Sequence, residues 1–436
     1  MALRIHWLAI LALTSGSRSA DAQTLGFAFD AYAEALTTVQ DLTEDGIPEL
    51  VLAGRAPVST YSHNIVVQLR DGGSGGLLAQ TSFATSSGSW RVSIANVGDM
   101  DGDGAEEFAV GDAAQQNPPP FFVFPLGVVK IYNSRSFLAA PAAGLVASFG
   151  SFSEPGIDTQ FGWSVAGVGD QDGDGLDDLA VGAPRAKSDR GRVEVVGLQT
   201  ATPGAVRLIA SHLGSNPADR FGEAIAGLGT YDCSDARPDF AVGLPGVQRV
   251  RVFAGPAPTD LQPPWPLVSF GASLANMDLA GSGARLLAIG APGDVCPSTL
   301  GSRWAVRHNT GCGTGNYVQF ESSSTSCLFP LPTRTLAGFF GDFCGPNCFG
   351  SSDCLFNVIG GVVSTTPAPN GYAVVSHFLV HGNNHASYCF YDKRLDSPIT
   401  GNNSFGTAVT GIVHASGAAW VAVSDFLNHT VYVYAP

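Results

Sequence analysis

Residues 169–184 read G-D-Q-D-G-D-G-L-D-D-L-A-V-G-A-P, and this stretch decides both the fold and the chemistry of the chain. Its first half places carboxylates at alternate positions, then a glycine at which the backbone can turn sharply, then a further carboxylate. Oxygen ligands at positions 1, 3, 5, 7 and 9 suit a hard cation such as Ca²⁺, which takes six to eight oxygens. The second half is a short apolar run ended by turn residues, which is typical of a buried strand. The candidate ligands are Asp170, Asp172, Asp174, the backbone carbonyl of Leu176, and Asp178.

Two other interpretations of this loop need to be weighed. An EF-hand would place a bidentate glutamate at position 12. That position is Val181, inside the apolar run, so an EF-hand is excluded. An acidic turn without metal is the remaining alternative. Four carboxylates around one glycine repel one another when no cation is bound, so a metal site is favoured.

The same loop and strand recur along the chain, as in repeat proteins. We name residues 41–49, 99–107 and 170–178 loop one, loop two and loop three. Thr43 replaces a carboxylate in loop one, so we expect the weakest binding there, and one Ca²⁺ in each of the three loops. The strand half alone returns at 240–245 and 287–292, and more weakly at 372–376 and 420–424; we expect no metal in those four repeats. The ligands of loops one and two are Asp41, Thr43, Asp45, the carbonyl of Ile47 and Glu49, and Asp99, Asp101, Asp103, the carbonyl of Ala105 and Glu107.

A second recurring segment precedes the acidic loop and begins with Phe-Gly. It is found at 161–167, 221–227, 270–275 and 405–411. The F-G start, the D-x-D-x-D-G-x-x-D loop and the G-A-P end resemble the FG-GAP repeats of integrin alpha-chain propellers and of related bacterial secreted proteins. This resemblance covers nearly all of the chain after residue 22. It implies a propeller in which the N-terminal strand, here 25–29, completes the last blade.

Seven copies of the strand half, at spacings that fit four short strands each, predict an all-β, seven-bladed β-propeller of FG-GAP-type repeats. Segments 90–97 and 163–168 are expected as inner strands. Third strands are expected at 128–132, 192–196, 249–253 and 430–434. The expected blades are roughly 25–75, 76–140, 141–200, 201–258, 259–310, 336–394 and 395–436.

The N-terminus and the composition predict a secreted, extracellular protein. Residues 1–22 resemble a secretory signal peptide, with Arg4 before an apolar core at 7–13 and an A-x-A site at 20–22. That core is too short to span a bilayer, and no later apolar stretch is long enough. The formal net charge of −15 argues against nucleic acid or an anionic membrane as partner.

The chain has eight cysteines, six of them in a long interval after residue 290. In an exported protein such cysteines indicate disulfides, whose pairing the sequence leaves open. Cys344, Cys348 and Cys354 do not have the spacing of a zinc site. We expect a disulfide-rich insertion at about 293–356 that forms a lobe on the partner-binding face.

The sequence offers no constellation of nucleophile, base and orienting group, so we predict that the protein is not an enzyme. It contains no H-E-x-x-H and no G-x-S-x-G, and His377, His381 and His385 are interpreted as ordinary turn histidines because Gly382 interrupts any helix there. The expected function is an extracellular binding or adhesion module for a protein or glycan. A secreted hydrolase or lyase on a propeller scaffold and a carbohydrate-binding propeller are the alternatives.

Overall fold

The structure is a computed structural model, and it describes the strands and most of the turns of the chain. The expected signal peptide lies outside the described residues. So does the disulfide prediction, because Cys354 alone among the cysteines falls in a described segment, and its side chain is not described. The described residues are 24–59, 62–85, 91–113, 127–153, 160–199, 202–231, 237–263, 269–278, 285–291, 303–309, 317–321, 333–340, 354–362, 372–379, 390–396, 398, 404–416 and 418–435.

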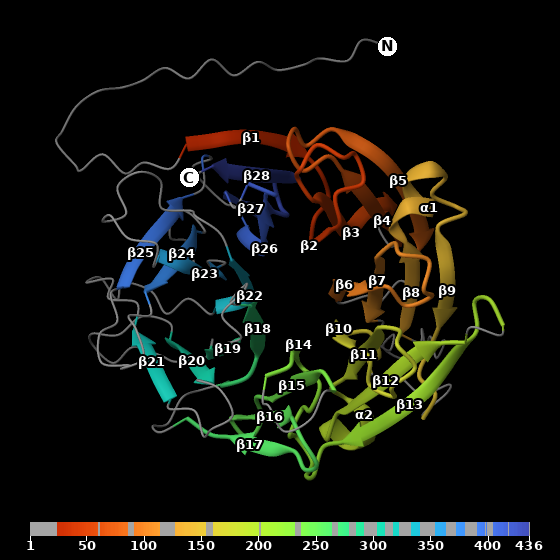
Figure 1. Cartoon of the computed structure of the whole chain (residues 1–436), viewed down its shortest axis with the longest axis vertical. Helices are drawn as coiled ribbons and strands as arrows, with labels where there is room; N and C mark the ends of the chain where they lie inside the picture. The colour runs from red at the N-terminus through yellow and green to blue at the C-terminus, as the bar shows by residue number, and fades with distance from the viewer. Residues whose placement is uncertain are drawn as a thin grey trace.

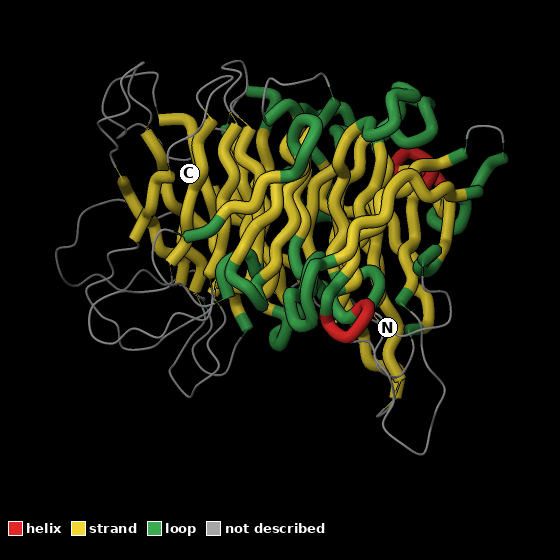
Figure 2. Tube along the Cα trace, turned by 90° about the horizontal axis from the view of Figure 1, so that it is seen from below, coloured by secondary structure: helices red, strands yellow, loops and turns green. Residues whose placement is uncertain are grey.

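The described strands form seven four-stranded antiparallel sheets arranged around a common centre (Figure 1). The side view shows the strands packed as one band, with loops gathered at its two ends (Figure 2). Two short helices, α1 (Ser134–Ala139) and α2 (Ala186–Asp189), lie in connections. From the centre outward the sheets are: one, β2 (Ala35–Val39), β3 (Glu49–Ser59), β4 (Ser62–Arg70), β5 (Leu77–Ala84); two, β6 (Arg91–Gly98), β7 (Glu107–Ala113), β8 (Val128–Asn133), β9 (Leu145–Phe149); three, β10 (Ser164–Gly169), β11 (Asp178–Ala183), β12 (Arg192–Leu198), β13 (Val206–Leu213); four, β14 (Ile225–Gly229), β15 (Asp239–Leu244), β16 (Arg249–Phe253), β17 (Thr259–Leu261); five, β18 (Ser273–Asp278), β19 (Arg285–Ala291), β20 (Arg303–Asn309), β21 (Tyr317–Glu321); six, β22 (Thr333–Phe340), β23 (Cys354–Val362), β24 (Tyr372–Leu379), β25 (Phe390–Asp396); and seven, β26 (Phe405–Val413), β27 (Ala419–Asp425), β28 (Thr430–Ala435), β1 (Thr24–Asp30).

The two ends of the chain share sheet seven. Strand β1 pairs antiparallel with β28, from Thr24 opposite Ala435 to Asp30 opposite Thr430. The expectation that 25–29 completes the last repeat is confirmed. A strand from the beginning of the chain thereby covers the outer edge of the last sheet, so that sheet is held by hydrogen bonds between distant parts of the sequence.

Close packing between neighbouring sheets explains the recurring glycines. A Cβ added to Gly182 would lie 2.2 Å from the carbonyl oxygen of Gly222, and one added to Gly111 would lie 2.3 Å from that of Gly162. The first glycine of each pair ends a strand half, and the second belongs to the Phe-Gly of the next sheet. Only glycine allows this approach of two backbones. The adjoining phenylalanines are buried; they are Phe161, Phe221, Phe270 and Phe405.

The second strands of sheets two, three and four are buried on both faces because sheets pack on either side of them. All residues of β7, β11 and β15 are buried. One apolar cluster joins Val97 and Ala109 of sheet two to Phe161 and Leu179 of sheet three. A strand that is buried on both faces needs apolar side chains on both, which explains why the strand halves are continuously apolar in sequence. The expected inner strands at 90–97 and 163–168 and the four expected third strands occur as β6, β10, β8, β12, β16 and β28.

The interval after residue 290 differs from the expectation. Residues 372–376 were predicted as the strand half of repeat six, that is, its second strand, but they lie in β24, the third. The second is β23, Cys354–Val362, whose sequence does not end in G-A-P. The expected insertion therefore contains ordinary sheet strands: β20 and β21 belong to sheet five, and β22 and β23 to sheet six.

The outermost strands also fall across several expected repeat boundaries. Strand β5, 77–84, pairs with β4 in sheet one, although the boundary was drawn at residue 75. Strands β9 and β13 likewise extend sheets two and three past 140 and 200. These strands are mostly half-buried or exposed, with a single buried residue in each of β5 and β9, so they lack the apolar pattern from which the boundaries were drawn.

The described inner strands run in the same direction, so the molecule has two distinct ends. The glycine near the end of the second strand in each of sheets two to four, Gly111, Gly182 or Gly243, lies beside the Phe-Gly glycine of the next sheet, at the start of the inner strands. The acidic loops follow the last residues of β2, β6 and β10, at the opposite end. None of the described helices is long and apolar enough to cross a membrane.

Candidate metal centre

Loop two folds around its first carboxylate. Oδ1 of Asp99 accepts the Gly102 N–H at 2.6 Å, and Oδ2 accepts the Gly104 N–H at 2.9 Å. Both glycines have positive φ, 81° and 79°, which a residue with a side chain rarely adopts. The Asp103 carboxylate in turn accepts the Ala105 N–H at 2.7 Å. The loop's own amides therefore bend the backbone so that its acidic side chains share one side.

Loop three repeats this fold. Asp170 accepts hydrogen bonds from Gly173 and Gly175, at 2.6 and 2.8 Å, and Asp174 accepts one from Leu176 at 2.9 Å. The Gln171 N–H donates to Asp178 at 2.7 Å, as the Met100 N–H donates to Glu107 at 2.6 Å in loop two. The two loops are the same structure built from different residues.

Each of these loops brings three carboxylates together. One oxygen from each of Asp99, Asp101 and Glu107 lies within 4.8 Å of the others, and the same holds for Asp170, Asp172 and Asp178. The position-five acids belong to neither group. Their second oxygens turn to side chains of neighbouring strands, Asp103 to Asn133 at 3.1 Å and Asp174 to Arg207 at 2.5 Å. Positions 1, 3 and 9 thus converge as the spacing indicated, and position 5 does not.

The position-nine acids are buried, which is unfavourable for their charge. Burial raises the pKa of Glu107 to about 8, and the negative charges of Asp101 and Asp103 add to this effect. Burial raises the pKa of Asp178 to about 7, again reinforced by Asp172 and Asp174. A bound cation would offset both the desolvation and the mutual repulsion of these carboxylates. The donor set therefore fits a hard divalent cation.

Loop one has the same backbone but fewer charges. Asp41 accepts the Gly46 N–H at 2.7 Å, Asp45 accepts the Ile47 N–H at 2.8 Å, and Glu49 accepts the N–H groups of Leu42 and Thr43 at 2.9 and 2.8 Å. Burial raises the pKa of Glu49. Within the described residues, no group of three carboxylates converges in loop one, because position three is a threonine.

The later repeats retain only parts of this arrangement. In repeat four the Tyr231 N–H donates to Asp239 at 2.7 Å, so the contact between positions 2 and 9 persists. Residues 232–236, between them, lie outside the described residues. In repeat seven the His414 N–H donates to the Ala418 carbonyl at 2.8 Å, as in a plain hairpin. That these repeats bind no metal stays a prediction.

Two features of the loops were not found from the sequence. Arg207, on the outer strand β13, forms ion pairs with Asp172 and Asp174 of loop three. It lies far from the loop in sequence, so no spacing reveals it. The second feature is the pair of acids at position eight, Glu106 and Asp177. They recur in the sequence, but their position relative to the metal ligands gave no indication of a role. Glu106 accepts the Gln40 N–H at 2.6 Å, and Asp177 accepts the Asp99 N–H at 2.9 Å, so each joins its loop to the preceding one.

Comparison with known proteins agrees with this architecture. The family models FG-GAP repeat and FG-GAP-like repeat match residues 161–196 and 41–110. The chain is 35% identical to chicken (Gallus gallus) integrin alpha-V over 156 residues, which are 34% of this chain and 13% of that protein. It is 35% identical to human integrin alpha-IIb over 232 residues, 47% of this chain and 20% of that protein. Integrin alpha-PS2 of Drosophila melanogaster is 34% identical over 158 residues, 34% of this chain and 10% of that protein.

The chain therefore contains FG-GAP-type repeats at 41–110 and 161–196. It is also similar to integrin alpha chains, as the resemblance in the sequence had predicted. The aligned regions span only about a tenth to a fifth of the length of these relatives.

Proposed function

We propose that the chain is a calcium-binding, seven-bladed propeller that acts outside the cell as a non-enzymatic binding or adhesion module. The observation that carries this proposal is the pair of convergent carboxylate groups in loops two and three, each with a buried position-nine acid, within repeats similar to those of integrin alpha chains. The seven described sheets around one centre support the propeller.

Calcium is the cation that best suits these loops. All ligands are oxygens, and the loops are turns built around glycine, which accommodate the irregular coordination of Ca²⁺ better than the rigid octahedron of Mg²⁺. In loops two and three the carboxylates at positions 1, 3, 5 and 9 would bind the ion, with the carbonyls of Ala105 and Leu176 at position 7. For position 5 to bind, Asp103 and Asp174 must turn from Asn133 and Arg207 towards the ion. Loop one would bind more weakly through Asp41, Thr43, Asp45, the Ile47 carbonyl and Glu49.

The bound ions would stabilise the loops rather than perform chemistry. Carboxylates that hold a cation stay ionised and serve poorly as general acids or bases. The secretory signal expected at 1–22 and the divalent cations of extracellular fluid fit this use. The partner we expect is an extracellular protein or glycan, recognised by the loops at the end of the molecule opposite the acidic loops, because loops on a rigid scaffold commonly carry binding.

Calorimetric titration of the secreted, EDTA-stripped protein with Ca²⁺ tests the metal proposal. We expect two comparable sites and a weaker third, and Asp99→Ala should remove one of the two. Asp189→Asn, which removes the charge of an exposed acid at the end of α2, away from the acidic loops, is the control. A titration without any saturable site would refute the proposal.

Partner recognition and the absence of catalysis need separate experiments. An array of extracellular proteins and glycans, probed with and without EGTA, should give calcium-dependent binding to at least one partner. Turnover of glycosides, esters or phosphodiesters should be absent from repurified protein. Turnover that survives repurification would instead support the hydrolase alternative.

A further inference from the structure

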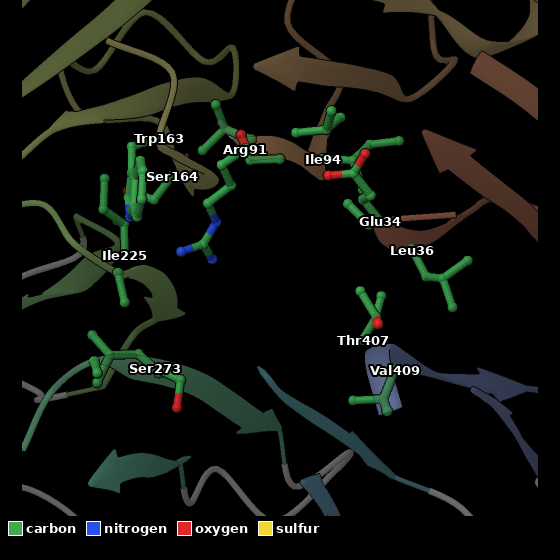
Figure 3. Close-up of a pocket in the computed structure, with 18 residues that line it drawn as sticks. Glu34, Leu36, Arg91, Ile94, Trp163, Ser164, Ile225, Ser273, Thr407 and Val409 are labelled. Carbon is green, nitrogen blue, oxygen red and sulfur yellow. The ribbon is translucent and has the colours of Figure 1, made fainter. Parts of the chain in front are cut away.

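A pocket of about 420 Å³ lies at the centre of the ring, lined by the first residues of the inner strands (Figure 3). Charged groups at this pocket act on one another. Glu34 is paired with Arg55 at 2.6 Å, and Glu223 is paired with Arg220 at 2.7 Å. The positive charge of Arg91 also stabilises the ionised form of Glu223. A second pocket differs from this one, because a polar side chain without a hydrogen bond faces it.

The second pocket, of about 370 Å³, lies between sheets three and four, towards the acidic loops. Sheet four leaves this space uncovered because its outer strand is short. Strand β17 pairs with β16 only at residues 250–252, so no strand of sheet four lies outside Phe253. Pro256 and Pro258 precede β17, and they lack the N–H groups that would extend its pairing. We call this the flank pocket, and its wall includes Gln171, Ile209, His212, Pro238, Phe240 and Phe253.

Flat rings form much of the wall of the flank pocket. The rings of Phe240 and Phe253 are stacked, with their centres 4.5 Å apart and their planes 7° from parallel. Pro238, Pro256 and Pro258 also line the pocket. Rings of this kind make broad apolar contacts with another flat ring, so the wall suits a planar ligand.

A histidine interrupts this apolar wall. His212, on the outer strand β13, lies opposite Val193 of β12. The equivalent residue of sheet two is Phe149, which lies opposite Val129 and whose ring contacts that of Phe161. The two positions are equivalent because Val129 and Val193 each pair with the glycine near the end of a second strand. An imidazole therefore replaces a phenyl ring at the outer side of a sheet interface.

The imidazole of His212 is held by packing rather than by hydrogen bonds. The centre of its ring lies 4.5 Å from that of Phe253 and 6.2 Å from that of Phe240. Within the described part of the chain, neither ring nitrogen of His212 forms a hydrogen bond. Burial and the positive charge of Arg251, itself paired with Asp260 at 2.7 Å, lower the pKa of His212. The ring is therefore neutral near pH 7, with one nitrogen as donor and the other as acceptor.

The other polar groups of the wall do not favour a charged ligand. Arg237 and Asp239 line the pocket with opposite charges. The carboxylate of Asp239 is buried and accepts the Tyr231 N–H at 2.7 Å. The side-chain nitrogen of Gln171 donates to two backbone carbonyls, at 2.8 and 2.7 Å. A neutral ligand with a polar atom placed for His212 fits this wall best.

We propose that the flank pocket binds a neutral phenol, either a small free compound or the side chain of a tyrosine on a partner protein. A ring nitrogen of His212 accepts the hydroxyl hydrogen, and the rings of Phe240, Phe253 and the prolines contact the phenol ring. A phenol combines a flat apolar body with one hydroxyl that needs a hydrogen-bond partner when it is buried. The volume lies in the lower part of the usual range for small-ligand pockets, about 300–1,000 Å³. The inference goes beyond the proposed calcium binding and does not rest on it, because none of the described lining residues is a proposed calcium ligand.

The test uses the full secreted chain and two pairs of probes. Para-cresol and its methyl ether represent the free compound, because methylation removes only the hydroxyl donor. N-acetyl-tyrosinamide and N-acetyl-phenylalaninamide represent the side chain of a partner. Binding is measured by saturation-transfer NMR and calorimetry in calcium-containing buffer. We expect saturable binding of one or both phenols, with each counterpart about tenfold weaker because one buried hydrogen bond is lost. Whichever phenol binds identifies the source.

Variants of the pocket wall locate the site. His212→Phe, which introduces the residue found in sheet two, should abolish the preference for a phenol over its counterpart. The control His63→Phe, in β4 of sheet one, should leave that preference unchanged. Ala210→Leu, which fills the pocket, should weaken the phenol and its counterpart alike. Should His212→Phe fail to fold, Ala210→Leu and the contrast on the wild-type chain decide.

Three results would each overturn the proposal: no binding of either phenol, equal binding of a phenol and its counterpart, or a preference unchanged by His212→Phe. Phenol binding unchanged by Ala210→Leu would do the same, because the ligand would then lie elsewhere. Phenol binding by a chain that takes up no calcium would leave this inference standing and refute the metal proposal alone. Calcium uptake without phenol binding would do the reverse.

Discussion

Loops two and three have the same backbone and the same converging carboxylates, but the neighbouring strands contact them through different side chains, a neutral amide in one and a cation in the other. In loop two the neutral side chain of Asn133 donates to Asp103 at 3.1 Å and to Glu107 at 2.7 Å, and its oxygen accepts the Ser136 N–H at the start of α1. In loop three the guanidinium of Arg207 pairs with Asp172 and Asp174.

The difference shows that two loops of one sequence pattern can have different affinities for a cation. Arg207 already supplies positive charge to loop three, and it holds the pKa of Asp172 below its usual range. A metal ion that enters loop three must compete with this arginine. In loop two the ion would meet the neutral hydrogen bonds of Asn133, and within the described part of the chain no ion pair to the buried Glu107 is found.

Removing calcium from the whole protein should have the largest effect. If each site has a dissociation constant near ~10⁻⁴ M, 1 mM calcium contributes roughly 1.4 kcal/mol per site, or about 4 kcal/mol for three independent sites. EGTA should therefore lower the melting temperature without abolishing the fold, since the packing of the apolar strands does not involve the ions. A melting temperature indifferent to EGTA would show that the loops are acidic turns only.

The pH dependence of the calcium-free protein distinguishes the loops. Glu107 has an ordinary pKa of 4.5 and a folded-state pKa of about 8, so between these values the folded protein binds more protons than the unfolded one. Its contribution to stability is therefore present below pH 4.5 and is lost as the pH rises towards 8. The contribution of Asp178, whose pKa is raised from 3.8 to about 7, is lost in the same way as the pH rises between these two values.

Glu107→Gln and Asp178→Asn are the matched variants for this prediction. Each should flatten the fall in stability between pH 5 and 8 in EGTA, measured by urea unfolding. Glu107→Gln should remove the part of the fall that runs from about pH 4.5 to 8, and Asp178→Asn the part that runs from about 3.8 to 7, so any fall between pH 7 and 8 is due mainly to Glu107. Calcium should flatten the wild-type curve as well, because a bound cation keeps both acids ionised. If the stability of the calcium-free wild type instead rises between pH 5 and 8, the raised pKa values of Glu107 and Asp178 are wrong.

Arg207→Gln tests the competition directly. Removing the arginine should raise the calcium affinity of loop three about tenfold, equivalent to about 1.4 kcal/mol. Arg207→Lys, which keeps the charge but loses the paired hydrogen bonds, should lie between wild type and Arg207→Gln. Arg135, which reaches only the Gly104 carbonyl of loop two at 3.5 Å, is the control, and Arg135→Gln should change little. An unchanged affinity in Arg207→Gln would mean that the two loops do not differ as proposed.

The sequence predicted those parts of the fold and site that rest on short-range pattern. Carboxylates two residues apart and a glycine turn are local, so Asp99, Asp101 and Glu107 could be assigned together. Strand halves buried on both faces are continuously apolar, so β7 and β11 could be placed.

The rest depends on long-range contacts. Arg207 meets loop three only after β13 pairs with β12, and β23 could not be identified because its end does not carry the G-A-P pattern. His212 stands where sheet two has an aromatic residue, and its meaning requires the pocket that it lines. Such residues are recognisable once neighbouring sheets are in place.

The smallest expected effect concerns the coupling of the two loops. The Asp177 carboxylate accepts the Asp99 N–H at 2.9 Å, and the Asp177 N–H donates to the Asp99 carbonyl at 3.0 Å, so loop three holds the first ligand residue of loop two. Asp177 is not itself a proposed ligand. Asp177→Ala should nevertheless weaken calcium binding in loop two about threefold, by roughly 0.6 kcal/mol, because Asp99 loses one of the contacts that orient it. The measurement is made in an Asp174→Ala background, in which loop three binds little calcium and loop two is observed with loop one alone. An affinity of loop two that is the same with and without Asp177 would mean that the two loops bind their ions independently.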